Sequence, residues 1–182
     1  MPITSYHDSP GLSFHALKDF ALSPRYYHDK HIAGIVPRRT CSAYRIGSLV
    51  HMAILEPERF SVEVVEVPQT YLTGQGKIST AKEARSWIDS LEGQEYVTPE
   101  EREQIARMAE SVHDDDRRAE LLRNGSAEVE WHGTHREQPV KGCADLISDG
   151  RVFDLKTISS LKEAVSHIKS YHYLHQLAWY AD

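Results

Sequence analysis

The sequence is poor in cysteine, with two residues in 182, Cys41 and Cys143. Two cysteines cannot form the disulfide framework of a small secreted domain, and the sequence has no CxxC pair of the kind that holds zinc or an iron–sulfur cluster. It also has no apolar run near the roughly 18 to 20 residues that span a bilayer. The start, MPITSYHDSP, lacks the basic and apolar regions of a secretory signal, so we expect a cytoplasmic location.

An excess of basic residues is also lacking, because 27 acidic and 21 basic residues give a formal charge of −6. DNA-binding domains usually carry the opposite excess, so the charge argues mildly against that class. It does not exclude an enzyme that gathers carboxylates around a cation, since the bound ion reverses the local field. The remaining composition, 40% hydrophobic and 26% charged, is that of a globular domain.

The first two thirds of the chain are predicted to be mostly helical. Apolar residues recur at helical spacing over residues 43–55, and Thr98-Pro99-Glu100-Glu101 supplies a cap, a proline and acidic side chains for a second clear helix. Ser23-Pro24 predicts another helix start. The predicted helices are 12–19, 43–55, 80–91 and 98 to about 123, and the valine-rich alternation of 60–67 predicts a strand.

The pattern changes near residue 127 to short β-type runs. Residues 127–131, 140–147 and 151–156 are the predicted strands, and Ser148-Asp149-Gly150 is a hairpin turn signal between the last two. Helical spacing resumes after Ser160, which with Glu163 resembles a capping box. There are no repeats or linkers, so we expect one α/β domain over residues 1–182.

The informative segment is GCADLISDGRVFDLKT, residues 142–157. On a strand, Asp154 and Lys156 would point to one face, and the hairpin would bring Asp145 close to Asp154. Two converging carboxylates repel unless a cation lies between them, and oxygen ligands suit Mg²⁺ or Mn²⁺. A metal beside a lysine can polarise a phosphodiester, orient water and neutralise the charge that develops in hydrolysis.

Taken one at a time, these residues have ordinary explanations. An isolated D-x-K is usually a solvated strand edge, and His51, Gln176 or Tyr180 alone would be a structural residue of a helix. The segment GQGK at 74–77 lacks the serine or threonine of a phosphate loop. The late histidines, residues 167, 172 and 175, lack the H-E-x-x-H spacing of a zinc site, so we expect them to line a polar face or contact phosphate.

Five segments together resemble PD-(D/E)XK nucleases, in the order of that superfamily. Two of them, Gly142-x-x-Asp145 and Asp154-Leu155-Lys156-Thr157, resemble its central motif. Gly47-Ser48-Leu49-Val50-His51 resembles the upstream G-x-x-x-H element of the RecB-type and exonuclease VIII (RecE-type) branches, and Gln176-x-x-x-Tyr180 their downstream helix. The segment LSFHALKDFALSPRYYHDKH is similar to the opening of phage and prophage exonuclease VIII-like proteins.

The resemblance implies roles for these residues. Asp145 and Asp154 would be catalytic metal ligands, Lys156 the catalytic lysine and His51 a further ligand, which would favour Mn²⁺ because imidazole is a softer donor. Gln176 and Tyr180 would contact the DNA backbone or support the centre. The strand before the hairpin offers one more carboxylate, Glu128 or Glu130, and of the two we prefer Glu130.

The fold implied is the PD-(D/E)XK core, a central mixed β-sheet flanked by helices. The activity implied is Mg²⁺- or Mn²⁺-dependent hydrolysis of DNA, in particular by a 5′→3′ double-strand exonuclease of phage or prophage recombination. Such enzymes act with a single-strand annealing protein and form rings. An endonuclease or defence nuclease, or an inactive member that only binds DNA or protein, is the alternative. Because relatives usually continue past the position of Asp182, we also expect a shortened or minimal core.

Overall fold

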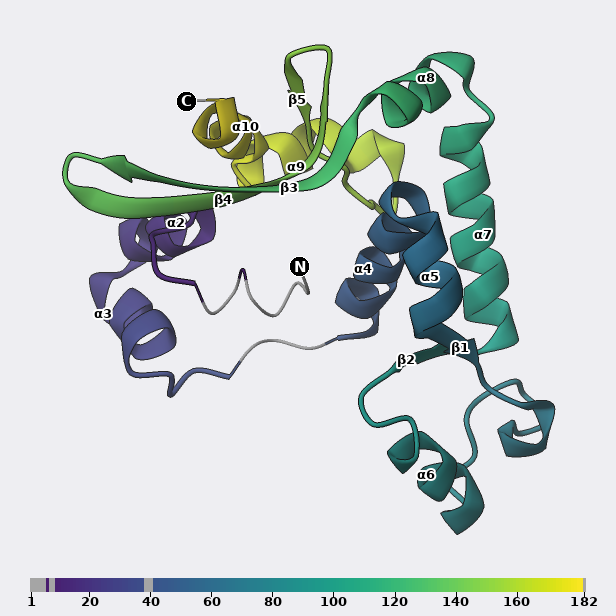
Figure 1. Ribbon diagram of the computed structural model, residues 1–182. Coiled ribbons are helices and arrows are strands. Elements are labelled where there is room, and N and C mark those ends of the chain that lie inside the picture. The colour runs from purple at the N-terminus through teal and green to yellow at the C-terminus, as the bar shows by residue number, and fades with distance from the viewer. Residues whose placement is uncertain (1–5, 7–8, 38–40, 182) are drawn as a thin grey trace. The chain divides into compact units, whose positions relative to one another are not determined.

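The computed structural model describes residues 6, 9–37 and 41–181 (Figure 1). The chain forms two compact units. The first combines Met1–Thr40 with Asn124–Asp182, and the second is Cys41–Arg123. The sequence-predicted loop around Arg38 and Arg39 lies outside the described residues.

A three-stranded antiparallel sheet forms the centre of the first unit. Its strands are β3 (Ser126–His135), β4 (Gln138–Ser148) and β5 (Arg151–Phe153), in the order β3-β4-β5 (Figure 1). Ser148 pairs with Arg151, so Asp149 and Gly150 alone connect β4 to β5. Their φ angles of 51° and 69° are those of the tight hairpin turn that suits twisted strands. The predicted turn is therefore confirmed.

The last strand is shorter than the sequence predicts, because it ends at Phe153 instead of reaching Lys156. Leu146 pairs with Phe153, so one more step of the ladder would place Asp154 opposite Asp145. Instead, the Leu155 backbone N–H donates to Asp145 Oδ2 over 2.6 Å. The Asp145 carboxylate thus accepts the hydrogen bond in place of a backbone carbonyl of β4. The chain leaves the sheet at Asp154.

Helices from both ends of the sequence complete the first unit. They are α2 (Phe14–Leu22), α3 (Pro24–Tyr27), the π-helical η1 (His28–Ile32), the 3-10 turn η3 (Leu161–Glu163), α9 (Ala164–Ser170) and α10 (Tyr173–Ala181). The predicted caps are present, since the hydroxyls of Ser13 and Ser23 accept from the backbone N–H groups of Ala16 and Tyr26, each over 3.2 Å.

The segment before α2 adds backbone pairing to the sheet. Leu12 N–H donates to Pro139 O over 2.9 Å, and Lys141 N–H donates to Leu12 O over 3.0 Å. The buried Lys141 ammonium donates to Ser9 O over 2.6 Å and to Tyr6 O over 2.8 Å. Since buried cations need such acceptors, Lys141 fastens the start of the chain to β4.

The second unit is mainly helical. Its elements are α4 (Ser42–Leu55), α5 (Pro57–Glu63), β1 (Val64–Glu66), η2 (Gln69–Tyr71), α6 (Lys82–Asp89), β2 (Glu95–Val97), α7 (Pro99–His113) and α8 (Asp116–Asn124), the last of which runs one residue into the first unit. The strands β1 and β2 pair in parallel. Fully buried aliphatic side chains form the core: Leu49, Val50, Val64, Val97 and Ile105.

The helix caps of this unit follow the sequence, whereas several boundaries do not. Thr98 and Glu101 form a reciprocal capping box at α7, and Glu101 also pairs with Arg45 of α4. The predicted strand over 60–67 begins only at Val64, because α5 includes residues 57–63. The predicted helix from 98 to 123 divides into α7 and α8, and β2 was not predicted.

The α/β class expected from the sequence is confirmed. Parallel and antiparallel strand pairs are both present, in a two-stranded and a three-stranded sheet, and helices accompany each. Within the described part of the chain, no helix has the length and apolar character needed to cross a membrane.

Candidate metal centre

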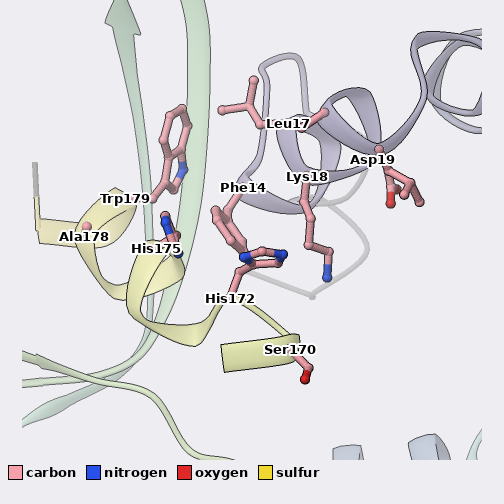
Figure 2. A pocket seen from close by; sticks show the side chains of 11 residues that line it. Phe14, Leu17, Lys18, Asp19, Ser170, His172, His175, Ala178 and Trp179 are labelled. Carbon is pink, nitrogen blue, oxygen red and sulfur yellow. The ribbon is translucent and has the colours of Figure 1, made fainter. Parts of the chain in front are cut away.

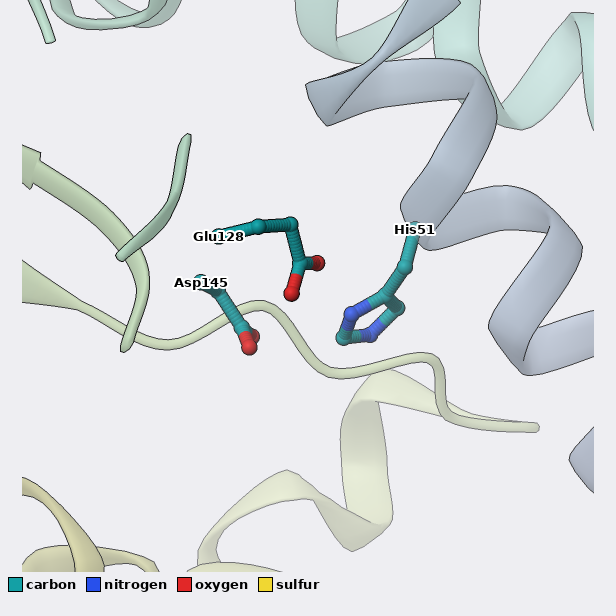
Figure 3. Close-up of side chains that lie close together, drawn as sticks. All are labelled: His51, Glu128 and Asp145. Atoms are coloured by element: carbon teal, nitrogen blue, oxygen red, sulfur yellow. The ribbon is translucent and has the colours of Figure 1, made fainter. Parts of the chain in front are cut away.

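Two carboxylates face one another on the antiparallel pair β3 and β4. Ala127 pairs with Leu146 and Val129 with Ala144, which leaves Glu128 and Asp145 at the position between these pairs. One carboxylate oxygen of each lies within 4.8 Å of the other (Figure 3). Both side chains are half-buried, so their charges are only partly screened by water. Their repulsion makes this position a natural cation site.

The pKa of Asp145 reflects the burial of its carboxyl group. Burial raises the pKa of the Asp145 carboxyl, while the Lys156 charge and the hydrogen bond from Leu155 N–H act in the opposite direction. Burial prevails, so the two partners do not fully compensate the lost hydration. A divalent cation would favour the ionised form by direct attraction.

Cys143 holds Glu128 from the neighbouring strand. Its thiol donates to Glu128 Oε2 over 3.4 Å. Burial, followed by the charges of Glu128, Glu130 and Asp145, raises the pKa of Cys143 to about 12. The sulfur is therefore a neutral hydrogen-bond donor at physiological pH. No sequence motif indicated this role, although Cys143 stands two residues before Asp145, on the same face of β4.

Glu130, the carboxylate preferred from the sequence, pairs with Cys143 in the strand register. Among the described residues, the group with metal-ligand spacing contains Glu128 and not Glu130. Strand alternation could not separate the two glutamates, because residues two apart share a face. The φ angle of 48° at Glu128 distinguishes it, since this left-handed conformation departs from an extended strand.

Asp154 and Lys156 form an ion pair just beyond β5. Asp154 Oδ2 lies 2.5 Å from Lys156 Nζ, and the aspartate side chain is 3% exposed against 29% for the lysine. Lys156 Nζ also donates to Leu155 O over 3.2 Å and lies 5.2 Å from the centre of the Tyr173 ring. The two residues are thus joined by an ion pair in a loop, and not by a shared face of a strand as the sequence predicts. Asp154 does not join the group that has metal-ligand spacing.

Gln176 and Tyr180 are neighbours on α10. Gln176 Nε2 donates to the Tyr180 hydroxyl over 2.9 Å, and Gln176 is 5% exposed. Burial raises the pKa of Tyr180, the Gln176 hydrogen bond lowers it, and the charges of Tyr6, Asp154 and Asp145 raise it further. The tyrosine hydroxyl is therefore a neutral donor beside the acidic side chains.

His51 lies on α4, in the second unit, and is half-buried. The apolar face of this helix explains its position: Leu49, Val50, Ala53 and Ile54 are buried, and the imidazole lies outside that face. Figure 3 labels the side chain with Glu128 and Asp145.

Comparison with protein families assigns the fold. The model of a PDDEXK-like domain of unknown function (DUF3799) matches residues 13–182, which include elements of both units. The chain belongs to this PDDEXK-like family. A search of curated proteins finds no match. The PDDEXK-like family has a nuclease-type fold, and Glu128 and Asp145 have the spacing of a group that could hold a metal ion.

Proposed function

We propose that this PDDEXK-like protein is a Mg²⁺- or Mn²⁺-dependent DNA nuclease, and specifically a 5′→3′ exonuclease on double-stranded DNA that serves phage or prophage recombination. The half-buried Glu128–Asp145 pair is the observation that carries the metal-dependent part. The order of the motifs, from Gly47 to Tyr180, supports the exonuclease part by resemblance.

The donor set fits a divalent cation. Glu128 and Asp145 offer carboxylate oxygens, which suit Mg²⁺ and Mn²⁺. By the family resemblance, His51 would add an imidazole nitrogen, which would favour Mn²⁺. Asp154 remains a proposed further ligand by its place in the Asp154-Leu155-Lys156 motif that resembles the family. When bound, the ion would polarise the phosphodiester and favour attack by water.

Lys156 would supply the positive charge from the protein. Its ammonium is held by Asp154 Oδ2 and by Leu155 O, so the position of the charge is fixed before the substrate arrives. A fixed cation stabilises charge that develops on phosphate oxygens without further reorganisation. Tyr180 and Gln176 carry neutral donors, which could bind phosphate oxygens of the strand that is cut.

The test compares end-labelled linear duplex DNA with closed circular duplex DNA in Mg²⁺, Mn²⁺ or EDTA. We expect degradation of linear DNA only, from the 5′ ends, and none in EDTA. Asp145→Ala and Lys156→Ala should each reduce the rate by at least about 100-fold, since both act on charge at the reacting phosphate. Asp149→Asn is the matched control, because Asp149 is an exposed residue of the adjacent hairpin turn.

The outcomes separate the alternatives. Cleavage of the closed circle would indicate an endonuclease or defence nuclease. Binding of DNA without cleavage in any metal would indicate an inactive member of the family. Activity that survives Asp145→Ala would contradict the proposed centre.

We also propose that the protein acts as a homo-oligomeric ring with a single-strand annealing partner. A ring that surrounds DNA would provide processivity despite a net charge of −6. Light scattering gives the mass of the particle, and a monomer at working concentrations would contradict the ring.

A further inference from the structure

A pocket in the first unit lies outside the metal centre. It has a volume of about 890 Å³ and lies between α2 and the end of the chain (Figure 2). Such a volume is within the range of about 300–1,000 Å³ that is usual for small-ligand pockets. Two aromatic side chains line it, Phe14 from α2 and Trp179 from α10. Hydrophobic walls of this kind accept the flat face of a ring.

Polar side chains stand around the apolar walls. Lys18 of α2 and the two histidines at α10, His172 and His175, line the same pocket (Figure 2). The rings of His172 and His175 lie 5.4 Å apart, edge to face, and both side chains are exposed. His172 has a φ of 60°, the left-handed conformation, where α9 gives way to α10. This turn places His172 beside His175.

Helix α10 carries residues of both the pocket and the proposed nuclease centre. Gln176 and Tyr180 of α10, with Tyr173 beside Lys156, are on the side of the acidic residues. His175 and Trp179 are on the adjacent side and line the pocket. Residues three or four apart share a helix face, so the two sets form neighbouring faces of α10. Helix α10 therefore contributes to the pocket on one face and to the proposed centre on the next.

The local charge points to an anionic ligand. Among the side chains that line the pocket, Lys18 carries a positive charge, and His172 and His175 add two imidazoles. Asp19 also lines the pocket, but its carboxylate is paired with Lys30 Nζ over 2.7 Å and with His31 Nε2 over 2.8 Å. Aromatic walls beside a lysine combine two features of sites for single-stranded nucleic acid, which stack on bases and attract phosphates.

We propose that this pocket holds a nucleobase of an unpaired nucleotide at the end of the DNA substrate. The inference rests on the proposed function for its substrate class, and it adds a binding site beyond the metal centre. Phe14 and Trp179 would contact the base, the two histidines would close over it, and Lys18 would attract the neighbouring phosphate. Sequence preference is not expected, because every base has a face that stacks.

The test measures binding of duplexes by fluorescence anisotropy in EDTA, so that no cleavage occurs. One duplex carries a short single-stranded tail with bases, and a second carries an abasic tail of the same length, which retains the phosphates. We expect the base-bearing tail to bind about tenfold more tightly, which is at the lower end of the stacking contribution of aromatic sites. Equal affinity for the two tails would overturn the proposal.

Variants connect the preference to the pocket. The double variant His172→Ala/His175→Ala should lose most of the preference for the base-bearing tail. Lys18→Ala should weaken binding of both tails equally, because it removes attraction to phosphate. His135→Ala is the control, since His135 is an exposed histidine at the end of β3, outside the pocket. A preference that persists in the double histidine variant would also overturn the proposal.

The two proposals fail in different ways. Cleavage of DNA without a preference for bases would refute the nucleobase pocket alone. A preference for bases without cleavage in Mg²⁺ or Mn²⁺ would refute the nuclease activity and leave the binding pocket in place.

Discussion

At the scale of single residues, Glu128 is held in an unusual state. Its φ of 48° lies in the left-handed region, within a strand whose neighbours pair regularly. Such a conformation costs about 1–3 kcal/mol in a residue that has a Cβ atom. The same conformation accompanies the contact with Cys143 and the position beside Asp145. Strain of this kind is tolerated where it sets a ligand in place, which is consistent with cation binding.

The two glutamates of β3 can be separated by experiment. Glu128→Gln removes the charge but keeps an acceptor for the Cys143 thiol, so the fold should persist. Mn²⁺ binding should weaken by at least about 10-fold, which is the loss expected even for a residue that only supports a ligand. Glu130→Gln is the matched variant two residues away and should change binding little. Calorimetric titration with Mn²⁺ measures both. A larger loss in the Glu130 variant would restore the preference that we drew from the sequence.

Asp145 predicts how stability depends on pH without metal. Its folded-state pKa is raised, so its contribution to stability is fully present below the unfolded pKa and is lost as pH rises through the folded pKa. Above that pH the ionised carboxylate destabilises the fold. Asp145→Asn removes this cost and can still accept from Leu155 N–H, so it should raise the melting temperature in EDTA at neutral pH.

The size of this change in melting temperature can be estimated, and its dependence on pH and metal provides controls. Each kcal/mol relieved should raise the melting temperature by roughly 2–4 °C in a chain of this length. The two proteins should converge below the usual aspartate pKa of about 3.9, where the wild-type side chain is protonated in both the folded and the unfolded state. Added Mn²⁺ should stabilise the wild type only. A variant that is less stable than the wild type in EDTA at neutral pH would show that ionised Asp145 is already compensated.

At the scale of elements, the hairpin after Asp145 was predictable, whereas its end was not. Asp149 and Gly150 tolerate positive φ, and that local property identifies the turn. The end of β5 depends on the Asp145 carboxylate, which takes the Leu155 N–H from outside the strand. Strand β2 was not predictable either, because it has three residues and pairs with β1, which is distant in the sequence. Three residues are too few to show a strand pattern.

Some residues of the candidate site could be predicted from their spacing in the sequence, whereas others depend on tertiary structure. Asp145, Asp154 and Lys156 follow from spacing around one hairpin, and the structure keeps them near one another. The choice of Glu128 over Glu130 depends on one backbone angle, which alternation cannot provide. Cys143 was overlooked because a thiol without a second cysteine resembles a core residue. Its role becomes visible only when Glu128 is opposite.

Gly142 belongs to the segment that resembles the family motif, and the need for glycine at this position is steric. It pairs with Trp131, and a Cβ atom at this position would lie closer than 3.0 Å to the indole. Gly142→Ala should therefore displace Trp131 and destabilise the protein by about 1–3 kcal/mol, as for other overpacked sites. Denaturation by urea measures the change. Gly133→Ala is the control, since its nearest contact would be an ordinary 3.6 Å. Equal stability of the two variants would mean that the indole moves at little cost.

At the scale of the whole molecule, the proposed ligands are divided between the two units. Glu128 and Asp145 belong to the first, and His51 belongs to the second. The stability of each unit in the presence of metal therefore tests whether His51 is a ligand. If one ion takes ligands from both, its binding free energy stabilises both, because any ligand stabilises the state that binds it. An ion held by the carboxylates alone would stabilise only the first unit.

Hydrogen exchange distinguishes these two outcomes. In the wild type, Mn²⁺ should slow amide exchange in β3 and β4 and also in α4, which carries His51. In His51→Ala, the protection of β3 and β4 should persist in weaker form, while α4 should exchange as it does without metal. His113→Ala is the control, because His113 is an exposed histidine of the same unit at the end of α7. If Mn²⁺ leaves α4 unchanged in the wild type, His51 is not a ligand, and the carboxylates of the first unit hold the ion without it.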